Sequence, residues 1–284
     1  MIQWLQQPKC SVVSKFIECY WLIEKNESTD SFQFPKLNPD PNGHLIISPE
    51  NQPYTYEMDG KITNGIGSHL LFPHLHTFKL DHTKPFIHLG VKFKVGALYS
   101  SNSLNDSPPT INDVKSINLH TLINNKELDI EAILSIARKD DAECRNQLDS
   151  FLIPWLNQFQ QDKYSELTAR ALEILDTTPI AKLSEKLHCT QRTLERAFNK
   201  VTGFTLKQCQ SMNRLEAMLE YLYALSKEEI DWAAVALQFG FSDQPHLIRY
   251  LKSQLGVTPN RYANERDLTI DAYGGISNQI NLSN

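Results

Sequence analysis

Two stretches of the chain carry long hydrogen-bonding side chains at matching positions. Arg192 and Arg196 lie one helical turn apart in the first stretch, and Arg249 occupies the position of Arg196 in the second. The stretches, residues 190–209 and 243–262, align at an offset of 53 and share glutamine, leucine, arginine, glycine and threonine. Arginine forms paired hydrogen bonds with guanine in the major groove of DNA, and glutamine does so with adenine. The repeat therefore indicates two surfaces suited to contacting bases.

Amphipathic helices are the elements that would position these side chains. In the first copy, Leu194, Phe198 and Val201 recur at helical spacing and form an apolar face opposite the arginines. In the second copy, Leu247 and Leu251 belong to the equivalent stripe. We call these two predicted helices, each of which ends at a glycine, the readout helices.

A shorter helical pattern precedes each readout helix, over residues 180–187 and 228–239. Thr190 and Asp243 are good caps for the readout helices themselves. A helix, a tight turn and a second helix with a polar outer face make the helix-turn-helix plan, whose second helix enters the major groove. The side chains predicted to contact DNA are Gln191, Arg192, Glu195, Arg196, Asn199, Gln244, His246, Ile248, Arg249 and Lys252.

Each of these assignments has a plainer alternative. Solvated helices also carry arginines. Arginine at equivalent positions of two capped helices nevertheless favours groove contact for Arg192, Arg196 and Arg249. The two glutamines stand at helix starts, where they would meet a base edge or a phosphate. Glu195 would accept from cytosine or pair with a neighbouring arginine. His246 and Lys252 are expected on phosphates or in solvent.

Further motifs make the pattern specific. The run G-F-S-D-Q-P-H at 240–246 is followed by G-V-T-P-N-R-Y at 256–262, and T-Q-R-T-L-E-R-A-F occupies 190–198. With these motifs, residues 165–265 resemble the DNA-binding domain of the AraC family of bacterial transcription regulators. The resemblance implies two helix-turn-helix units in one all-α domain.

Three residues depart from the usual pattern of that family. His188 stands where the first turn usually has glycine, so a side chain must tolerate a positive φ. Cys209 replaces a tyrosine, and Met218 replaces an alanine in the helix predicted over 205–224. That helix joins the two units and would be about 30 Å long. One turn of B-DNA is about 34 Å, so the two units would reach successive major-groove segments.

Composition suits a two-domain globular protein. The chain has 284 residues, 41% of them hydrophobic, and five scattered cysteines, which fits a reducing cytoplasm. Neither a signal peptide nor a membrane-length apolar run is visible. The net charge is −5, yet residues 165–266 carry about +1, from 13 basic and 12 acidic residues. We therefore expect modest non-specific affinity for DNA.

The first 115 residues alternate in the manner of β-strands, and helical patterns follow over 118–160. The predicted fold class is α+β, with an N-terminal antiparallel β barrel or sandwich, following helices, and a C-terminal double helix-turn-helix. Motifs such as F-I-E-C-Y-W and L-G-V-K-F-K-V-G are similar to a sensor-like domain of one AraC subgroup. The predicted strands cover 16–24, 44–48, 69–72, 76–80 and 86–95.

Four segments are predicted from these patterns. A β-rich regulatory or sensor domain would span 1–115, and a helical connector suited to dimerisation would span 116–162. The DNA-binding domain would span 163–266, and a poorly ordered tail would follow over 267–284.

Six of the nine histidines lie in the β-rich part. His74 and His76 would share a strand face, and with Asp81 they loosely resemble the metal motif of cupins. A metal needs three or four converging ligands, which no spacing here demands. We therefore expect surface or packing histidines, with no metal, no other cofactor and no catalytic residue.

The predicted function is that of a sequence-specific DNA-binding transcription regulator in the cytoplasm, not an enzyme. Double-stranded DNA is the expected partner, and no membrane contact is expected. RNA polymerase, a small-molecule effector of the N-terminal domain and a second copy of the chain are further candidate partners. Two alternatives stay open: a cupin-like metalloenzyme domain fused to a DNA-binding module, and an N-terminal domain that acts only in oligomerisation.

Overall fold

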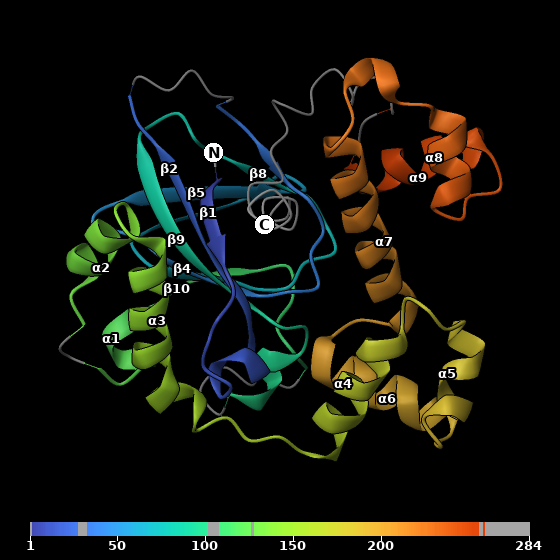
Figure 1. The fold of residues 1–284 in the computed structure, drawn as a ribbon, viewed down its shortest axis with the longest axis horizontal. Helices are drawn as coiled ribbons and strands as arrows, with labels where there is room; N and C mark the ends of the chain where they lie inside the picture. The colour runs from blue at the N-terminus through green and yellow to red at the C-terminus, as the bar shows by residue number, and fades with distance from the viewer. Residues whose placement is uncertain (1, 28–32, 102–107, 126–127, 256–257, 259–284) are drawn as a thin grey trace.

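The chain folds into a β-rich half and an all-helical half (Figure 1). The computed structural model describes residues 2–27, 33–101, 108–125, 128–255 and 258. The predicted tail at 267–284 and most of the motif at 256–262 lie outside these residues. Within the described ranges, no helix combines the length and the apolar character needed to cross a membrane.

Two antiparallel sheets build the β-rich half. The larger has the strand order β1-β2-β9-β4-β7-β10, and the smaller has the order β3-β8-β5-β6. The sheets do not close into a barrel, so the sandwich form of the expected fold is the observed one. The strands are β1 (Ile2–Gln6), β2 (Ile17–Lys25), β3 (Lys36–Leu37), β4 (His44–Ile47), β5 (Pro53–Met58), β6 (Lys61–Ile66), β7 (His69–Leu71), β8 (Phe78–Leu80), β9 (Phe86–Phe93) and β10 (Val114–Ser116).

Side-chain alternation along the larger sheet separates two cores. Trp21 and Ile46 point to the smaller sheet and join a core with Phe78. Leu22 and Leu89 point to the opposite face, which three helices cover with their own apolar side chains (Figure 1). The larger sheet is therefore the middle layer of this half. The covering helices are α1 (Leu119–Leu122), α2 (Ile130–Ala137) and α3 (Asp141–Leu156).

Six further helices form the other half, and five of them lie close to predicted positions, whereas the helix at Lys163–Ile174 was not predicted. The predicted helix over 228–239 is shorter than expected, because residues 227–229 form a 3-10 turn and Asp231 caps α8. Trp232 begins α8 and is only half-buried. The helices are α4 (Lys163–Ile174), α5 (Ile180–Lys186), α6 (Gln191–Thr202), α7 (Leu206–Tyr223), α8 (Trp232–Gln238) and α9 (Gln244–Leu255).

The long helix α7 belongs to both helix-turn-helix units. Its first half places Cys209 and Met212 in the core of α4, α5 and α6. Its second half places Met218 and Leu222 in the core of α8 and α9. The unusual residues at 209 and 218 are thus fully buried, one in each unit. The predicted joining helix is confirmed, and it is also a shared wall of the two units.

Candidate DNA-binding interface

The first readout helix, α6, is sharply divided into a buried and an exposed face. Leu194, Ala197 and Phe198 are completely buried. The Thr190 side chain caps the helix by accepting from the Thr193 N–H, and Gly203 ends it with a φ of 77°. This local chemistry fixes which side of the helix faces solvent.

The second readout helix, α9, has the same construction. Leu247 and Leu251 are completely buried. The Asp243 carboxylate accepts from the His246 N–H at 2.7 Å, which is the predicted N-cap.

The turn before the first readout helix also has the expected geometry, because His188 adopts a φ of 54°.

All ten side chains predicted to contact DNA lie at the surface of these two helices. Gln191 and Ile248 are half-buried and the other eight are exposed. Glu195 accepts from the Gln191 amide at 2.8 Å, so in this structure it pairs with a glutamine instead of an arginine. His246 packs edge-on against Phe241 at 5.2 Å between ring centres, so it also supports its own turn.

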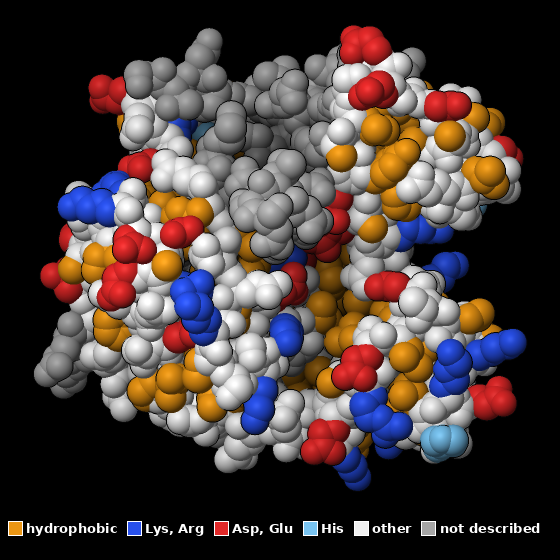
Figure 2. Space-filling model, viewed as in Figure 1, with side chains coloured by type: hydrophobic (Ala, Val, Ile, Leu, Met, Phe, Trp, Pro, Cys, Tyr) orange, Lys and Arg blue, Asp and Glu red, His pale blue; other side chains and the backbone are white. Residues whose placement is uncertain are grey.

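Aromatic side chains beside α6 support two of its cations. The Lys200 ammonium lies 4.1 Å from the ring centre of Tyr164, and the Arg196 guanidinium lies 5.9 Å from it. The Tyr99 hydroxyl, from the β-rich half, donates to Asp162 at 2.9 Å and lies close to Lys200. Lysines and arginines gather on the surface of the first unit in Figure 2, although the chain as a whole is acidic. Such local placement suits binding to a phosphate backbone.

The histidines of the β-rich half do not converge. His74 lies before β8, outside the strand, and is buried, where burial lowers its pKa to about 4. His76 is exposed beside Asp59, 3.4 Å away, and Asp81 bonds Thr83. The expectation that His74 and His76 share a strand face is therefore wrong. Among the described residues, no three histidine, cysteine or acidic side chains are grouped so as to hold a metal.

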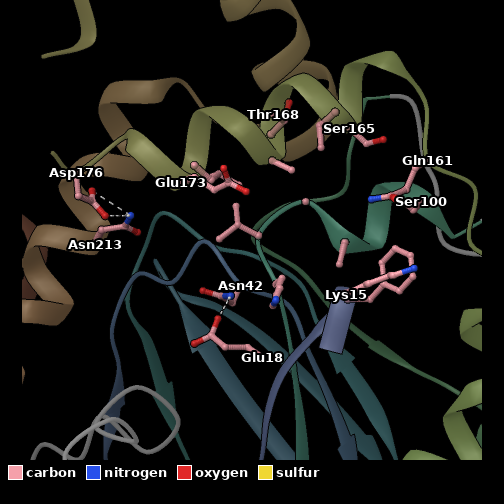
Figure 3. A pocket seen from close by; sticks show the side chains of 18 of the residues that line it. Lys15, Glu18, Asn42, Ser100, Gln161, Ser165, Thr168, Glu173, Asp176 and Asn213 are labelled. Atoms are coloured by element: carbon pink, nitrogen blue, oxygen red, sulfur yellow. Dashed lines mark hydrogen bonds between the residues drawn. The ribbon is translucent and has the colours of Figure 1, made fainter. Parts of the chain in front are cut away.

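A cleft lies between the two halves of the molecule. It has a volume of about 670 Å³, and its walls come from the β-rich half, α4 and α7. Figure 2 shows the hollow surface, and Figure 3 shows Lys15, Glu18 and Asn42 facing Glu173 and Asp176 across it. Both polar and apolar side chains line its walls.

A buried ion pair beside this cleft was missed by sequence reasoning. The Lys92 ammonium on β9 lies 3.2 Å from Glu216 on α7 and 3.3 Å from Glu18 on β2. The only signal in the sequence was a lysine at an inward-pointing position of an apolar strand. Its partner on α7 is 124 residues away, and no local pattern could identify it.

Comparison with protein families identifies residues 183–265 as a helix-turn-helix domain. No curated protein matches the chain. Among solved structures, the chain is similar to ToxT from Vibrio cholerae O395, with 14% identity over 88% of this chain and 97% of that one and a TM-score of 0.46. It is also similar to the C-terminal domain of AraT, a response regulator from Geobacillus stearothermophilus, with 21% identity over 39% and 93% of the two chains and a TM-score of 0.33.

The family match covers α6 to α9 and most of α5, which are the elements that build both readout surfaces. It agrees with the motifs at 190–198 and 240–246 and with the two capped, amphipathic helices of the structure. The C-terminal part of the chain is thus a DNA-binding domain of the AraC type, and the chain is a transcription regulator that carries this domain.

Proposed function

We propose that α6 and α9 enter two successive segments of the major groove on one face of a DNA duplex. The observation that carries this proposal is that both helices expose equivalent polar faces while α7 belongs to the cores of both units. The 18 residues of α7 span about 27 Å at 1.5 Å per residue. This length is comparable with the roughly 34 Å of one duplex turn.

Within this proposal, the ten side chains of the readout helices have different tasks. Arg192, Arg196 and Arg249 contact base edges, because they are exposed and project from helices whose opposite faces are buried. His246 and Lys252 contact phosphates. The remaining five residues, which are Gln191, Glu195, Asn199, Gln244 and Ile248, contact bases or phosphates according to the target sequence.

The β-rich half would regulate this activity by binding a small-molecule effector. The cleft between the halves is the site that we assign to it, since a ligand that contacts both walls binds best when they are docked and so favours that arrangement. Its volume lies within the range of small-molecule sites. A thermal-shift screen of the full chain against metabolites tests this assignment. Ligands found there should lose their effect when Asn42, which lines the cleft, is replaced by leucine.

The remaining parts of the proposal concern partners and location. Residues 116–162 would support a homodimer, and RNA polymerase would be the partner at a promoter. A regulator of chromosomal DNA works in the cytoplasm, and neither catalysis nor a cofactor is required for this task. The four predicted segments, with boundaries at 115, 162 and 266, belong to the same proposal.

Replacing Arg196 or Arg249 with alanine tests the two-reader arrangement. Each change should weaken binding to the cognate site by about 1–3 kcal/mol and relax the preference at a few base pairs. Footprinting should place the two losses about one helical turn apart. Arg138→Ala, on the β-rich half, is the matched control and should leave the footprint unchanged. Protection of one short segment by both helices would contradict the model.

A further inference from the structure

The two halves of the molecule meet at an ammonium group that has almost no contact with water. The Lys92 side chain is 3% exposed, and it bridges Glu18 of its own half and Glu216 of α7. Glu216 is 32% exposed and lines the cleft. Because α7 belongs to both helix-turn-helix units, this contact connects the sandwich to the whole DNA-binding half.

More carboxylates than cations surround this contact. Asp40 is buried beside Lys92 and accepts a hydrogen bond from His44 at 3.1 Å. Although burial raises the pKa of Asp40, Lys92 and His44 hold it below its ordinary value. Burial lowers the pKa of Lys92, but the carboxylates around it raise the pKa well above its usual range. Lys92 and Asp40 therefore stay charged, and an ionised Glu216 would add a further negative charge beside this pair.

Glu216 is the member of the cluster that responds to pH. Burial raises its pKa to about 7, Lys92 opposes this shift, and Asp40 and Glu18 reinforce it. Other charged groups face the same cleft from every surrounding element. They are Lys15 before β2, Lys94 after β9, Glu173 and Asp176 in and after α4, and Glu220 one turn further along α7.

We propose that Glu216 is a proton-controlled latch, which docks α7 on the β-rich half when it is neutral and weakens the docking when it is ionised. Neutral Glu216 still accepts the hydrogen bond from Lys92 without adding a charge to a site that Asp40 and Glu18 already make negative. Ionised Glu216 repels both of those carboxylates within a partly buried contact.

The direction of the pH dependence follows from proton linkage. An undocked Glu216 would titrate near 4.5, its ordinary value, whereas the docked group titrates at about 7. The docked form therefore binds the proton more tightly, so docking is strongest below about pH 4.5 and weakens as the pH rises through 7. Between pH 6 and pH 8, the ratio of docked to undocked molecules should fall about tenfold.

The halves also meet at other places. Leu75, Val95 and Ile111 of the β-rich half pack against the core of the first helix-turn-helix unit, and the contacts to α9 are polar. Lys36 donates to the Leu255 carbonyl at 3.3 Å, and Thr77 donates to the Gln254 carbonyl at 2.9 Å. Both carbonyls are in the last turn of α9, one of the two proposed DNA-contacting helices. On the proposed function, release of the latch would therefore free the C-terminal half to adjust to DNA.

The test uses the full chain without DNA, so that its outcome does not depend on the proposed DNA contacts. Small-angle X-ray scattering at pH 6, 7 and 8 measures the radius of gyration of wild type and of Glu216→Gln. Wild type should expand as the pH rises, while the glutamine variant, which mimics neutral Glu216, should stay compact throughout. Glu173→Gln removes a carboxylate from the same cleft and should expand as wild type does.

A carboxyl-carbon NMR titration of the wild-type chain provides a second measurement that needs no variant. One glutamate should titrate near pH 7, and its signal should be absent in Glu216→Gln. A radius that does not change with pH, or an equal expansion of wild type and the glutamine variant, would overturn the latch. So would the lack of any glutamate titrating above pH 6.

Discussion

At the scale of single residues, Lys92 indicates a buried charged contact that the apolar residues around it in β9 do not. On β9, Leu89 and Val91 point to the helices α1 to α3, whereas the alternate residues His88, Gly90 and Lys92 point the other way. At Gly90 an added methyl group would lie 1.8 Å from the Trp21 ring, so only glycine fits there. A lysine in such a position needs a carboxylate partner, and this need could be predicted from the strand pattern. The identity of the partner could not, because it depends on how the two halves dock.

The residue with the clearest backbone strain in the DNA-binding half is His188. A non-glycine residue in the left-handed region destabilises the fold by about 1–2 kcal/mol. Glycine removes this strain, but part of the gain is lost because glycine gives up more conformational entropy on folding. We expect His188→Gly to stabilise the first helix-turn-helix unit by about 0.5–1 kcal/mol, measured by native-state hydrogen exchange of α6 amides. Asn124→Gly, at a φ of 53°, is the control and should change stability less, because asparagine tolerates this region. A loss of α6 protection in His188→Gly would mean that the imidazole itself holds the turn.

At the scale of elements, α7 packs against both helix-turn-helix units. Its first half presents apolar side chains to the first unit and its second half to the second unit, so buried residues continue along its whole length. Met212 is 2% exposed in the first unit, and Leu222 is fully buried in the second. Damage at either end should therefore remain local to one unit.

Met212→Ala and Leu222→Ala make a matched pair for testing this division. Each substitution should cost about 2–5 kcal/mol through lost burial and the cavity left behind. Footprints should lose the segment read by α6 in the first variant and the segment read by α9 in the second. Loss of the complete footprint in both variants would show that the units fold as one.

The helices α6, α7 and α9 could be predicted almost to the residue because each has a helical apolar pattern and a recognisable cap. The helix α4 was not predicted, and α8 begins later than expected. Thr190 and Asp243 cap as expected, and Gly203 stops α6. The strands β1, β3, β5, β6 and β10 were missed. Two of them, β3 and β10, have only two and three residues. The strands β5 and β6 form a hairpin whose Asp59-Gly60 turn has positive φ at both positions, which is a recognised hairpin signal. No such local signal indicated that His74 and His76 would not share a strand face. His74 lies outside the strand that follows it.

At the scale of the whole molecule, the two halves meet at contacts on both helix-turn-helix units. The end of α6 comes close to the sandwich, where a methyl group added to Gly203 would lie 2.8 Å from Ile111. The latch at Glu216 and the carbonyl contacts of α9 lie further along the same interface. Both units have their own buried cores, and Leu75, Val95 and Ile111 of the sandwich add only partly buried contacts to the first one.

A fragment of residues 160–270 should therefore fold alone and recognise the same DNA sequence as the full chain. Its binding should lack the component of pH dependence that comes from Glu216, because Lys92, Asp40 and Glu18 are all absent from it. In the full chain, docking competes with adjustment to two grooves, so its affinity relative to the fragment should be lower at pH 6 than at pH 8. Fluorescence anisotropy with one labelled duplex at both pH values measures these affinities. A well-folded fragment without specific binding would contradict this expectation and would make the sandwich part of the DNA reader.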